Sequence, residues 1–501
     1  MKKQAYNPFL PPDVYIPDGE PHVFGNRVYL YGSHDQEGGQ HYCMLDYECW
    51  SAPVDDLSDW RCEGTIYRAE QCPHYNEGRQ DLYAPDVVQG PDGRYYLYYD
   101  LSGRSGNHGF DGPISVAVCD TPAGKYTYYG DVHYPDGRPM RRFIPFDPAV
   151  LNDSGRIWLT YGWGLGMDTH APIMRNVMPH VMSKIFNKPL AEIREEEPKS
   201  ILGANIVELE PDMQTVKSEP KRILPALNNA PKGSPLRDHS FYEAASLRKI
   251  GQLYYFIYSS HNGHELCYAT SPYPDRGYTY RGVIVSNGDI GLDGRNAKDK
   301  VNAVATNHGS IEKINGQYYI FYHRQTHGTD FSRQACAEPI RIEADGMIRQ
   351  VPVTSCGLNG GPLRGEGIYP AYICCNLTNG KMPKLSNTRK NPSIPNVSHE
   401  GSKHFIRAIT DKTMVGYKYF SFCGETSLCL TYRGDGGQVF VSVGDCEVGK
   451  ISLPSAKTWQ NSEGMTIQAS GKQPLYFVYH GTGKIDLLQF ELEVCSHADN
   501  F

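Results

Sequence analysis

The 501-residue sequence has no apolar run of the about 18 residues that cross a bilayer, so we expect no membrane partner. It has no excess of positive charge either, with 49 Lys and Arg against 56 Asp and Glu. The electrostatic signature of nucleic-acid binding is therefore missing. The N-terminal segment 1–8 contains two Lys residues but no apolar core after them, so we expect no secretory signal.

The 14 cysteines form no Cys-x-x-Cys motif. Cys374 and Cys375 are adjacent, and neighbouring cysteines are poor disulfide partners. We therefore expect reduced thiols that serve as small apolar side chains in a cytoplasmic protein.

Aromatic residues and turn formers are abundant: 36 Tyr, 17 Phe, 51 Gly and 35 Pro. Aromatic strands separated by Gly- and Pro-containing turns are typical of an all-β protein. Apolar residues make up 40% of the chain, which excludes a disordered polar chain.

One pattern occurs five times along the chain: a polar residue, a short apolar stretch, a turn and an aromatic strand. Asn315-Gly316, in the fifth copy, is a strong hairpin signal. The five aromatic strands are Val28–Tyr31, Tyr95–Tyr99, Ile157–Tyr161, Tyr254–Tyr258 and Tyr318–Tyr322. Each polar residue, here called a lead residue, precedes its aromatic strand by roughly ten positions; the lead residues are Glu20, Asp86, Asp147, Glu243 and His308.

Successive lead residues are about 60 to 95 positions apart, which leaves room for four strands and their loops in each repeat. Repeats of this size indicate a β-propeller. We predict a five-bladed β-propeller domain over residues 1–355.

The innermost strands of a propeller run along its central axis, so the lead residues are expected to converge at one end of the channel. Four of the five are carboxylates, and like charges in one small space raise one another's pKa. The alternative is that each lead residue caps a strand end in solvent. The repetition of the pattern favours a shared site.

Such a carboxylate cluster suits glycoside hydrolysis, in which one carboxyl group protonates the leaving oxygen and another activates water or attacks directly. A third can raise and steer the pKa of the acid. Sugar rings pack on aromatic faces, and Tyr83, Trp163 and Tyr242 lie on or near the lead-residue strands. Each of these three is also a typical core residue.

The five segments resemble glycoside hydrolase family 43, a family of five-bladed propellers, over about residues 6–345. Tyr83-Ala84-Pro85-Asp86 is similar to the second-blade motif of that family and makes Asp86 a candidate substrate-binding residue. The resemblance implies that Asp147 is the pKa modulator and Glu243 the general acid. It also implies that His308 points into the channel, where in some members it approaches a central Ca²⁺, so His308 is a candidate for substrate binding and for the metal.

The base of the family is normally an Asp in an Asp-Pro pair, and the matching pair here is Glu20-Pro21. Asp18 is the rival, since strand alternation would place residues 18 and 20 on the same face. We favour Glu20, because its spacing to Tyr29 equals that from Asp86 to Tyr95. Asp18 is then a substrate-binding candidate.

The resemblance further implies inversion at the anomeric carbon, with acid and base carboxyl groups about 6.5–9.5 Å apart. Arg324 follows the fifth aromatic strand, where it is a candidate for a sugar hydroxyl, for Asp147, or for the protein surface. His22, His34 and Asp35 are further candidates for the pocket.

After about residue 360 the repeat stops, and alternating strands follow. They predict an antiparallel β-sandwich over residues 356–501. Leu475–Gly481 and Ile485–Leu492 resemble the jelly-roll of carbohydrate-binding module family 6. Sugar binding and packing against the propeller are both open roles for it.

The sequence therefore predicts an inverting, exo-acting glycosidase that releases α-L-arabinofuranose or β-D-xylose from plant-derived oligosaccharides. Glu243 is the expected acid, Glu20 the base and Asp147 the modulator, with no required cofactor. A non-catalytic sugar-binding propeller and a metal-dependent enzyme using His308 are the alternatives. The oligomeric state stays open, a homo-oligomer included.

Overall fold

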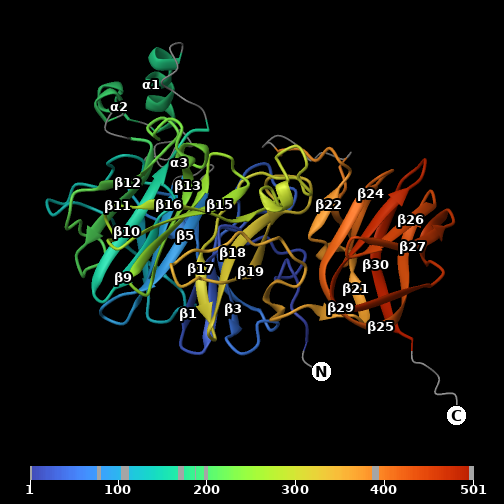
Figure 1. The fold of residues 1–501 in the computed structure, drawn as a ribbon. Helices are drawn as coiled ribbons and strands as arrows, with labels where there is room; N and C mark the ends of the chain where they lie inside the picture. The colour runs from blue at the N-terminus through green and yellow to red at the C-terminus, as the bar shows by residue number, and fades with distance from the viewer. Residues whose placement is uncertain are drawn as a thin grey trace.

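A computed structural model of the chain describes residues 3–75, 81–102, 112–166, 174–186, 188–196, 201–385 and 394–495. Five separate sheets, one for each sequence repeat, form the N-terminal part, and a larger strand network forms the C-terminal part (Figure 1). The all-β class and the five blades are thereby confirmed. No helix in the described part of the chain is both long and apolar enough to cross a membrane.

The first four blades each contain four antiparallel strands in chain order. Blade one contains β1 (Glu20–Phe24), β2 (Arg27–Tyr31), β3 (Tyr47–Pro53) and β4 (Arg61–Tyr67). Blade two contains β5 (Leu82–Gln89), β6 (Tyr95–Leu101), β7 (Ser115–Cys119) and β8 (Thr127–Asp131). Blade three contains β9 (Ala149–Asp153), β10 (Arg156–Trp163), β11 (Gly203–Leu209) and β12 (Lys221–Pro225). Blade four contains β13 (Phe241–Ile250), β14 (Leu253–Ser260), β15 (Glu265–Ser271) and β16 (Thr279–Ser286).

The fifth blade has three strands among the described residues: β17 (Ile311–Ile314), β18 (Gln317–Gln325) and β19 (Arg333–Ile340). Asn315 and Gly316 link β17 to β18 with φ angles of 47° and 88°. Positive φ at both central residues is the tight hairpin geometry that Asn-Gly favours. The hairpin predicted at this position is confirmed.

The ring closes where the first blade meets the fifth. Gly19 and Gly309 form a parallel bridge, which joins the segment before β1 to the segment before β17. Gly309 has no room for a side chain, because a Cβ there would lie 1.9 Å from the carbonyl oxygen of Phe321. Asp18 and His308 immediately precede these two glycines. The close approach therefore brings both residues to the same end of the propeller axis.

Blade three carries an insertion between β10 and β11 that includes α1 (Met174–Ile185) and α2 (Leu190–Glu196). The two helices stand at one end of the propeller, away from the blades (Figure 1). Met178, Met182 and Phe186 of this insertion are buried in a cluster that also contains Phe146 and contacts Trp163. A third helix, α3 (Pro235–Asp238), precedes β13.

The C-terminal network joins eleven strands, all antiparallel except for the pair β20–β25. Short 3₁₀ segments lie at Ala69–Gln71, Leu292–Gly294, Gly357–Asn359 and Ala371–Ile373. The eleven strands are β20 (Leu363–Arg364), β21 (Gly367–Pro370), β22 (Asn376–Thr378), β23 (Asn396–Glu400), β24 (Lys403–Ile409), β25 (Met414–Gly434), β26 (Gly437–Val443), β27 (Cys446–Leu453), β28 (Ala456–Asn461), β29 (Met465–His480) and β30 (Ile485–Val494).

The long strands β25 and β29 pair with each other and with several of the shorter strands. Their alternating burial places one face of each strand in a single large apolar core. The domain boundary at residue 355/356 falls between β19 and β20 and stays a prediction, as does the resemblance to family 6 binding modules.

Candidate active site

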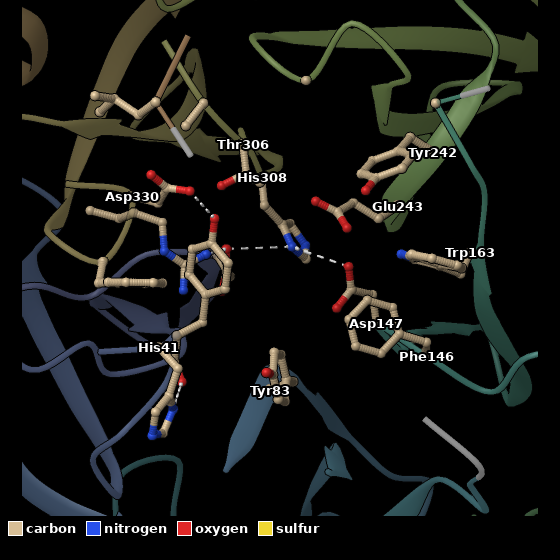
Figure 2. A pocket seen from close by; sticks show the side chains of 18 of the residues that line it. His41, Tyr83, Phe146, Asp147, Trp163, Tyr242, Glu243, Thr306, His308 and Asp330 are labelled. Atoms are coloured by element: carbon tan, nitrogen blue, oxygen red, sulfur yellow. Dashed lines mark hydrogen bonds and ion pairs between the residues drawn. The ribbon is translucent and has the colours of Figure 1, made fainter. Parts of the chain in front are cut away.

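A cavity of about 610 Å³ lies beside the contact between the first and fifth blades. Its walls include Asp18, Asp147, Glu243 and His308, which precede or begin the innermost strands of blades one, three, four and five. In Figure 2, Asp147 and Glu243 face His308 across the cavity. The structure therefore brings three of the five lead residues to one site, together with Asp18.

Asp18 is nearly buried and held by a cation. Arg333 donates from Nη1 to Asp18 Oδ1 at 2.7 Å, and His323 Nδ1 lies 3.3 Å from the same oxygen. Burial acts to raise the pKa of Asp18, but the positive charge of Arg333 outweighs it and holds that pKa well below its usual range. Asp18 is therefore ionised at neutral pH, as a base that activates water must be.

The pKa of Glu243 is shifted in the opposite direction to that of Asp18. Burial, followed by the negative charge of Asp18, raises the pKa of Glu243 to about 7, although Arg333 and a hydrogen bond from Trp163 act the other way. The group therefore keeps its proton in a large fraction of molecules near neutrality, which is the state of a general acid.

Asp147 connects the acid to the rest of the site. Its Oδ2 accepts a hydrogen bond of 2.9 Å from the backbone N–H of Ala244, the residue after Glu243, and lies 3.8 Å from His308 Nδ1. Burial and the charges of Glu243 and Asp18 raise the pKa of Asp147. Burial also lowers the pKa of His308 to about 4, so this imidazole is neutral at pH 7.

Three of these positions depend on unusual backbone conformations. Asp18, Asp147 and Ala244 have φ angles of 57°, 49° and 65°, in the left-handed region that ordinary side chains rarely adopt. Such conformations collect at functional sites, where the surrounding structure holds them in place.

Aromatic side chains line one side of the cavity. Tyr83, Phe146, Trp163 and Tyr242 all contribute to its surface. The rings of Trp163 and Tyr242 are 5.9 Å apart, and those of Tyr83 and Phe146 are 5.7 Å apart. Figure 2 shows Trp163, Tyr242 and Phe146 on the side of Glu243 and Asp147. The predicted Tyr83, Trp163 and Tyr242 thus all reach the site.

Glu20 does not reach the cavity. Its carboxylate is buried and pairs with Arg248, whose Nη2 lies 2.5 Å from Glu20 Oε2. Burial raises the pKa of Glu20 to about 7, against the effect of Arg248. The expectation that residues 18 and 20 share a strand face fails, because β1 begins at Glu20 and the left-handed Asp18 lies before it.

Asp86 does not line the cavity either, and it links three blades. Its Oδ1 accepts from the backbone N–H of Val87 and lies 2.6 Å from His22 Nε2, and its Oδ2 accepts from the backbone N–H of Val150. The convergence predicted for the lead residues is therefore partial. Asp147, Glu243 and His308 line the cavity, and Glu20 and Asp86 do not.

Arg324 is buried away from the cavity. It donates to the backbone oxygen of Cys374 and to Asn302, at the contact with the C-terminal part. The arginine of the site is Arg333, which the sequence analysis did not select. Arg333 is the first residue of β19 and belongs to no sequence motif. The one indication of this part of the site in the sequence was Asp35, a further pocket candidate, which pairs with Arg333 in the structure.

Tyr42 was missed as well. Its hydroxyl donates to Asp330 at 3.0 Å, and its ring lies against the guanidinium of Arg333, 4.6 Å from ring centre to carbon. Tyr42 lies on the long β2–β3 connection, outside the repeated hairpin pattern.

Two groups of three metal-binding side chains occur among the described residues: Glu20–His22–Asp86 and His239–Glu265–Cys267. Neither contains His308. In the first group, Arg248, His22 and backbone N–H groups already bind all carboxylate oxygens except Glu20 Oε1. Ca²⁺ takes 6–8 oxygen ligands, so this donor set does not suit calcium.

The fold and the site together define a propeller with an ionised carboxylate and a high-pKa carboxyl group on one cavity, an arrangement that suits acid–base hydrolysis. Comparisons with known proteins agree. The model of "Glycosyl hydrolases family 43" matches residues 6–201. A xylosidase/arabinosidase of Thermoclostridium stercorarium is 44% identical over 98% of this chain and 99% of its own length.

A xylosidase/arabinosidase of Bacteroides ovatus is 30% identical over 68% of this chain and 96% of its own length. Among solved structures, a family 43 β-xylosidase/α-arabinofuranosidase from a compost metagenome, in complex with xylotriose and in calcium-free form, matches with a TM-score of 0.51. It is 25% identical and covers 70% of this chain and 98% of that one. The chain belongs to glycoside hydrolase family 43 and is a glycoside hydrolase.

Proposed function

We propose that the protein is an inverting, exo-acting glycosidase that removes a terminal pentose, α-L-arabinofuranose or β-D-xylose, from short plant-derived oligosaccharides. The observation that carries this proposal is the opposite tuning of Asp18 and Glu243 on one cavity. The pentose class rests on the names of the relatives.

In the proposed reaction, Asp18 accepts a proton from a water molecule as that water attacks the anomeric carbon. Glu243 donates its proton to the glycosidic oxygen, and the bond from the anomeric carbon to that oxygen breaks. Asp147 holds the segment that carries Glu243, because its carboxylate accepts a hydrogen bond from the backbone N–H of Ala244. Its role as modulator of the acid stays part of the proposal. The base is therefore Asp18 in this proposal, in place of Glu20.

Arg333 fixes the base. It donates one hydrogen bond to Asp18. It donates two more to Asp35, at 2.8 and 2.9 Å. A bidentate pair of this kind holds both groups in one geometry. Inversion requires room for water between acid and base, so we keep the expected separation of about 6.5–9.5 Å between the Asp18 and Glu243 carboxyl groups.

Proton NMR of the first sugar released tests the reaction, because it reports both turnover and the anomer formed. We expect the anomer opposite to that of the substrate. Release of the anomer with retained configuration would contradict inversion. No release from any pentoside would leave the non-catalytic sugar-binding propeller as the better interpretation.

Three variants assign the roles. Asp18→Asn is expected to lower kcat by about 100-fold or more on every substrate, the usual contribution of a general base. Glu243→Gln should lower it as much on oligosaccharides but much less on a dinitrophenyl glycoside, whose leaving group needs little protonation. Glu20→Gln, as the control, should lower kcat less than tenfold; a larger loss there than for Asp18→Asn would return the base role to Glu20.

We further propose that the chemistry needs no cofactor and that the Glu20–His22–Asp86 group holds no resident calcium, since three of its four carboxylate oxygens already have protein partners. Dialysis against EDTA should leave the rate unchanged.

We also propose an intracellular location, where the enzyme would trim imported oligomers. All 14 cysteines are free thiols in the structure, which suits a reducing compartment.

A further inference from the structure

Part of the cavity wall comes from outside the propeller repeats. Lys384 and Leu385 line the cavity, although they follow the last blade by more than forty residues and lie between β22 and β23. They belong to residues 381–385, here called the wall segment.

The wall segment is attached along its backbone to the loop that leads to His308. Val304 donates to the backbone oxygen of Pro383 at 3.2 Å, and Leu385 donates back to the oxygen of Val304 at 2.8 Å. These two bonds make a parallel bridge between Val304 and Lys384. Upstream, Leu377 donates to the oxygen of Val301 at 2.8 Å. The position of the wall segment relative to the site is therefore set by main-chain bonds.

Apolar contacts secure the same attachment. Met382, Leu385 and Ile394 form a buried cluster with Ala305 of the loop before His308. Leu385 presents apolar surface to the cavity on one side and packs into this cluster on the other.

Lys384 is the charged residue of the wall segment that reaches the cavity. Its side chain is exposed, and Nζ donates to the backbone oxygen of Asn262 at 3.1 Å. No carboxylate among the described residues lies within ion-pair distance of it. An ammonium group has three donors, so further donors are available for a ligand.

The wall segment contacts blade four, the blade that carries the general acid. Lys384 contacts the β14–β15 turn, and the end of β14 pairs with the end of β13 that carries Glu243, with Phe241 opposite Ser260. His261 of that turn also lines the cavity, and its Nδ1 lies 3.0 Å from Ser240 Oγ, which leaves Nε2 available for a ligand. Burial lowers the pKa of His261, so the ring is neutral at pH 7.

A general acid stands beside the leaving-group oxygen, because that oxygen receives its proton. The wall segment lines the same cavity as Glu243 and contacts the same blade, so we infer that it faces the leaving group. The wall offers the mixture of donors and apolar contact that a sugar ring requires: Lys384, the neutral His261, and the apolar surface of Leu385 and Ala305.

We propose that the wall segment forms the leaving-group subsite of this enzyme and that Lys384 is a specificity-determining residue, which donates to a hydroxyl of the sugar in that subsite. This inference rests on the proposed function. It gives the region after the propeller a direct part in substrate selection, apart from any sugar binding of its own.

The test compares two substrates with the same terminal pentose: an oligosaccharide such as xylotriose and the matching nitrophenyl pentoside, whose leaving group has no sugar hydroxyls. Lys384→Met should lower kcat/KM for the oligosaccharide by about tenfold, the weight of one bond from a charged donor. For the nitrophenyl pentoside it should change kcat/KM by less than twofold. Lys381→Met is the matched control, since Lys381 is an exposed lysine of the same segment that does not line the cavity.

Binding gives a second readout. In a Glu243→Gln background, calorimetry with unhydrolysed xylotriose should show weaker binding when Lys384→Met is added and no change with Lys381→Met. Equal losses on both substrates, or no loss on either, would overturn the leaving-group assignment. Absence of any pentosidase activity in the unmodified chain would instead contradict the proposed function, so the two failures are distinguishable.

Discussion

At the scale of single residues, the site depends on two carboxyl groups, Asp18 and Glu243, whose surroundings shift their pKa values in opposite directions. Arg333 lowers the pKa of Asp18, whereas burial and the negative charge of Asp18 raise the pKa of Glu243. The types and positions of Asp147, Glu243 and His308 were predictable, because each lies at the same point of a repeated pattern. Arg333 was not predictable, since its role comes only from its contact with two aspartates far away in the sequence.

The pKa values predict the shape of the pH profile. Glu243 must be protonated to act, and its pKa is raised to about 7, so kcat/KM should fall tenfold per pH unit above about 7. The pKa of Asp18 is held well below its usual range, so the base stays ionised as the pH falls through 5. Initial rates on an oligosaccharide between pH 4.5 and 9 measure this.

A dinitrophenyl glycoside is the control for that profile. Its leaving group departs without protonation, so the decline above pH 7 should disappear. A profile that falls between pH 6 and 5 on both substrates would show that the base has an ordinary or raised pKa, which contradicts the assignment of Asp18.

At the scale of elements, the hairpins were the most predictable part of the fold. The aromatic strand of each copy is found in the structure, from β2 to β18, because alternation and turn residues act locally. What local pattern did not predict is where each innermost strand begins. β1 begins at Glu20, and the turn at Asp18 and Gly19 depends on the bridge to Gly309 in the last blade.

The ring closure predicts the effect of one substitution. Gly309→Ala places a methyl group 1.9 Å from the backbone oxygen of Phe321, so the two closing segments must move apart. We expect destabilisation of about 1–3 kcal/mol or more, as for other overpacked sites, and a loss of activity because Asp18 and His308 separate. Thermal unfolding and kcat together measure it.

Gly361→Ala is the matched control, because no atom lies within 4 Å of the position that a Cβ would take there and its φ is ordinary. It should leave both the unfolding midpoint and kcat unchanged. Equal behaviour of the two variants would show that the contact at Gly309 is not a constraint on the ring.

At the scale of the whole molecule, the C-terminal part is joined to the propeller by buried polar contacts. Lys418 of β25 pairs with Asp289, which follows β16, at 2.7 Å, and both side chains are nearly buried. Asp289 also accepts bonds from Asn376 and from the backbone of Val353. The predicted antiparallel strands after residue 400 were found, but these contacts between distant segments had no pattern in the sequence.

Lys418→Met should destabilise the molecule, because it leaves Asp289 buried without its cation. Breaking a buried pair costs about 3–5 kcal/mol, so we expect the first unfolding midpoint to fall by more than about 5 °C. Calorimetry measures the midpoint. The double variant Lys418→Met with Asp289→Asn should recover part of the loss, and a single variant that unfolds like the unmodified chain would contradict a stabilising role for the pair.

The all-β class, the five repeats and the kind of chemistry follow from the amino-acid sequence alone, because strand periodicity, turn residues and repeated carboxylates are properties of short segments. Three further features emerge only in the folded molecule: which carboxylates share the cavity, which arginine holds the base, and that residues 381–385 reach the site. They depend on the closure of the ring and on contacts across hundreds of residues. Asp18, in a left-handed conformation just before β1, lines the cavity, whereas Glu20 does not.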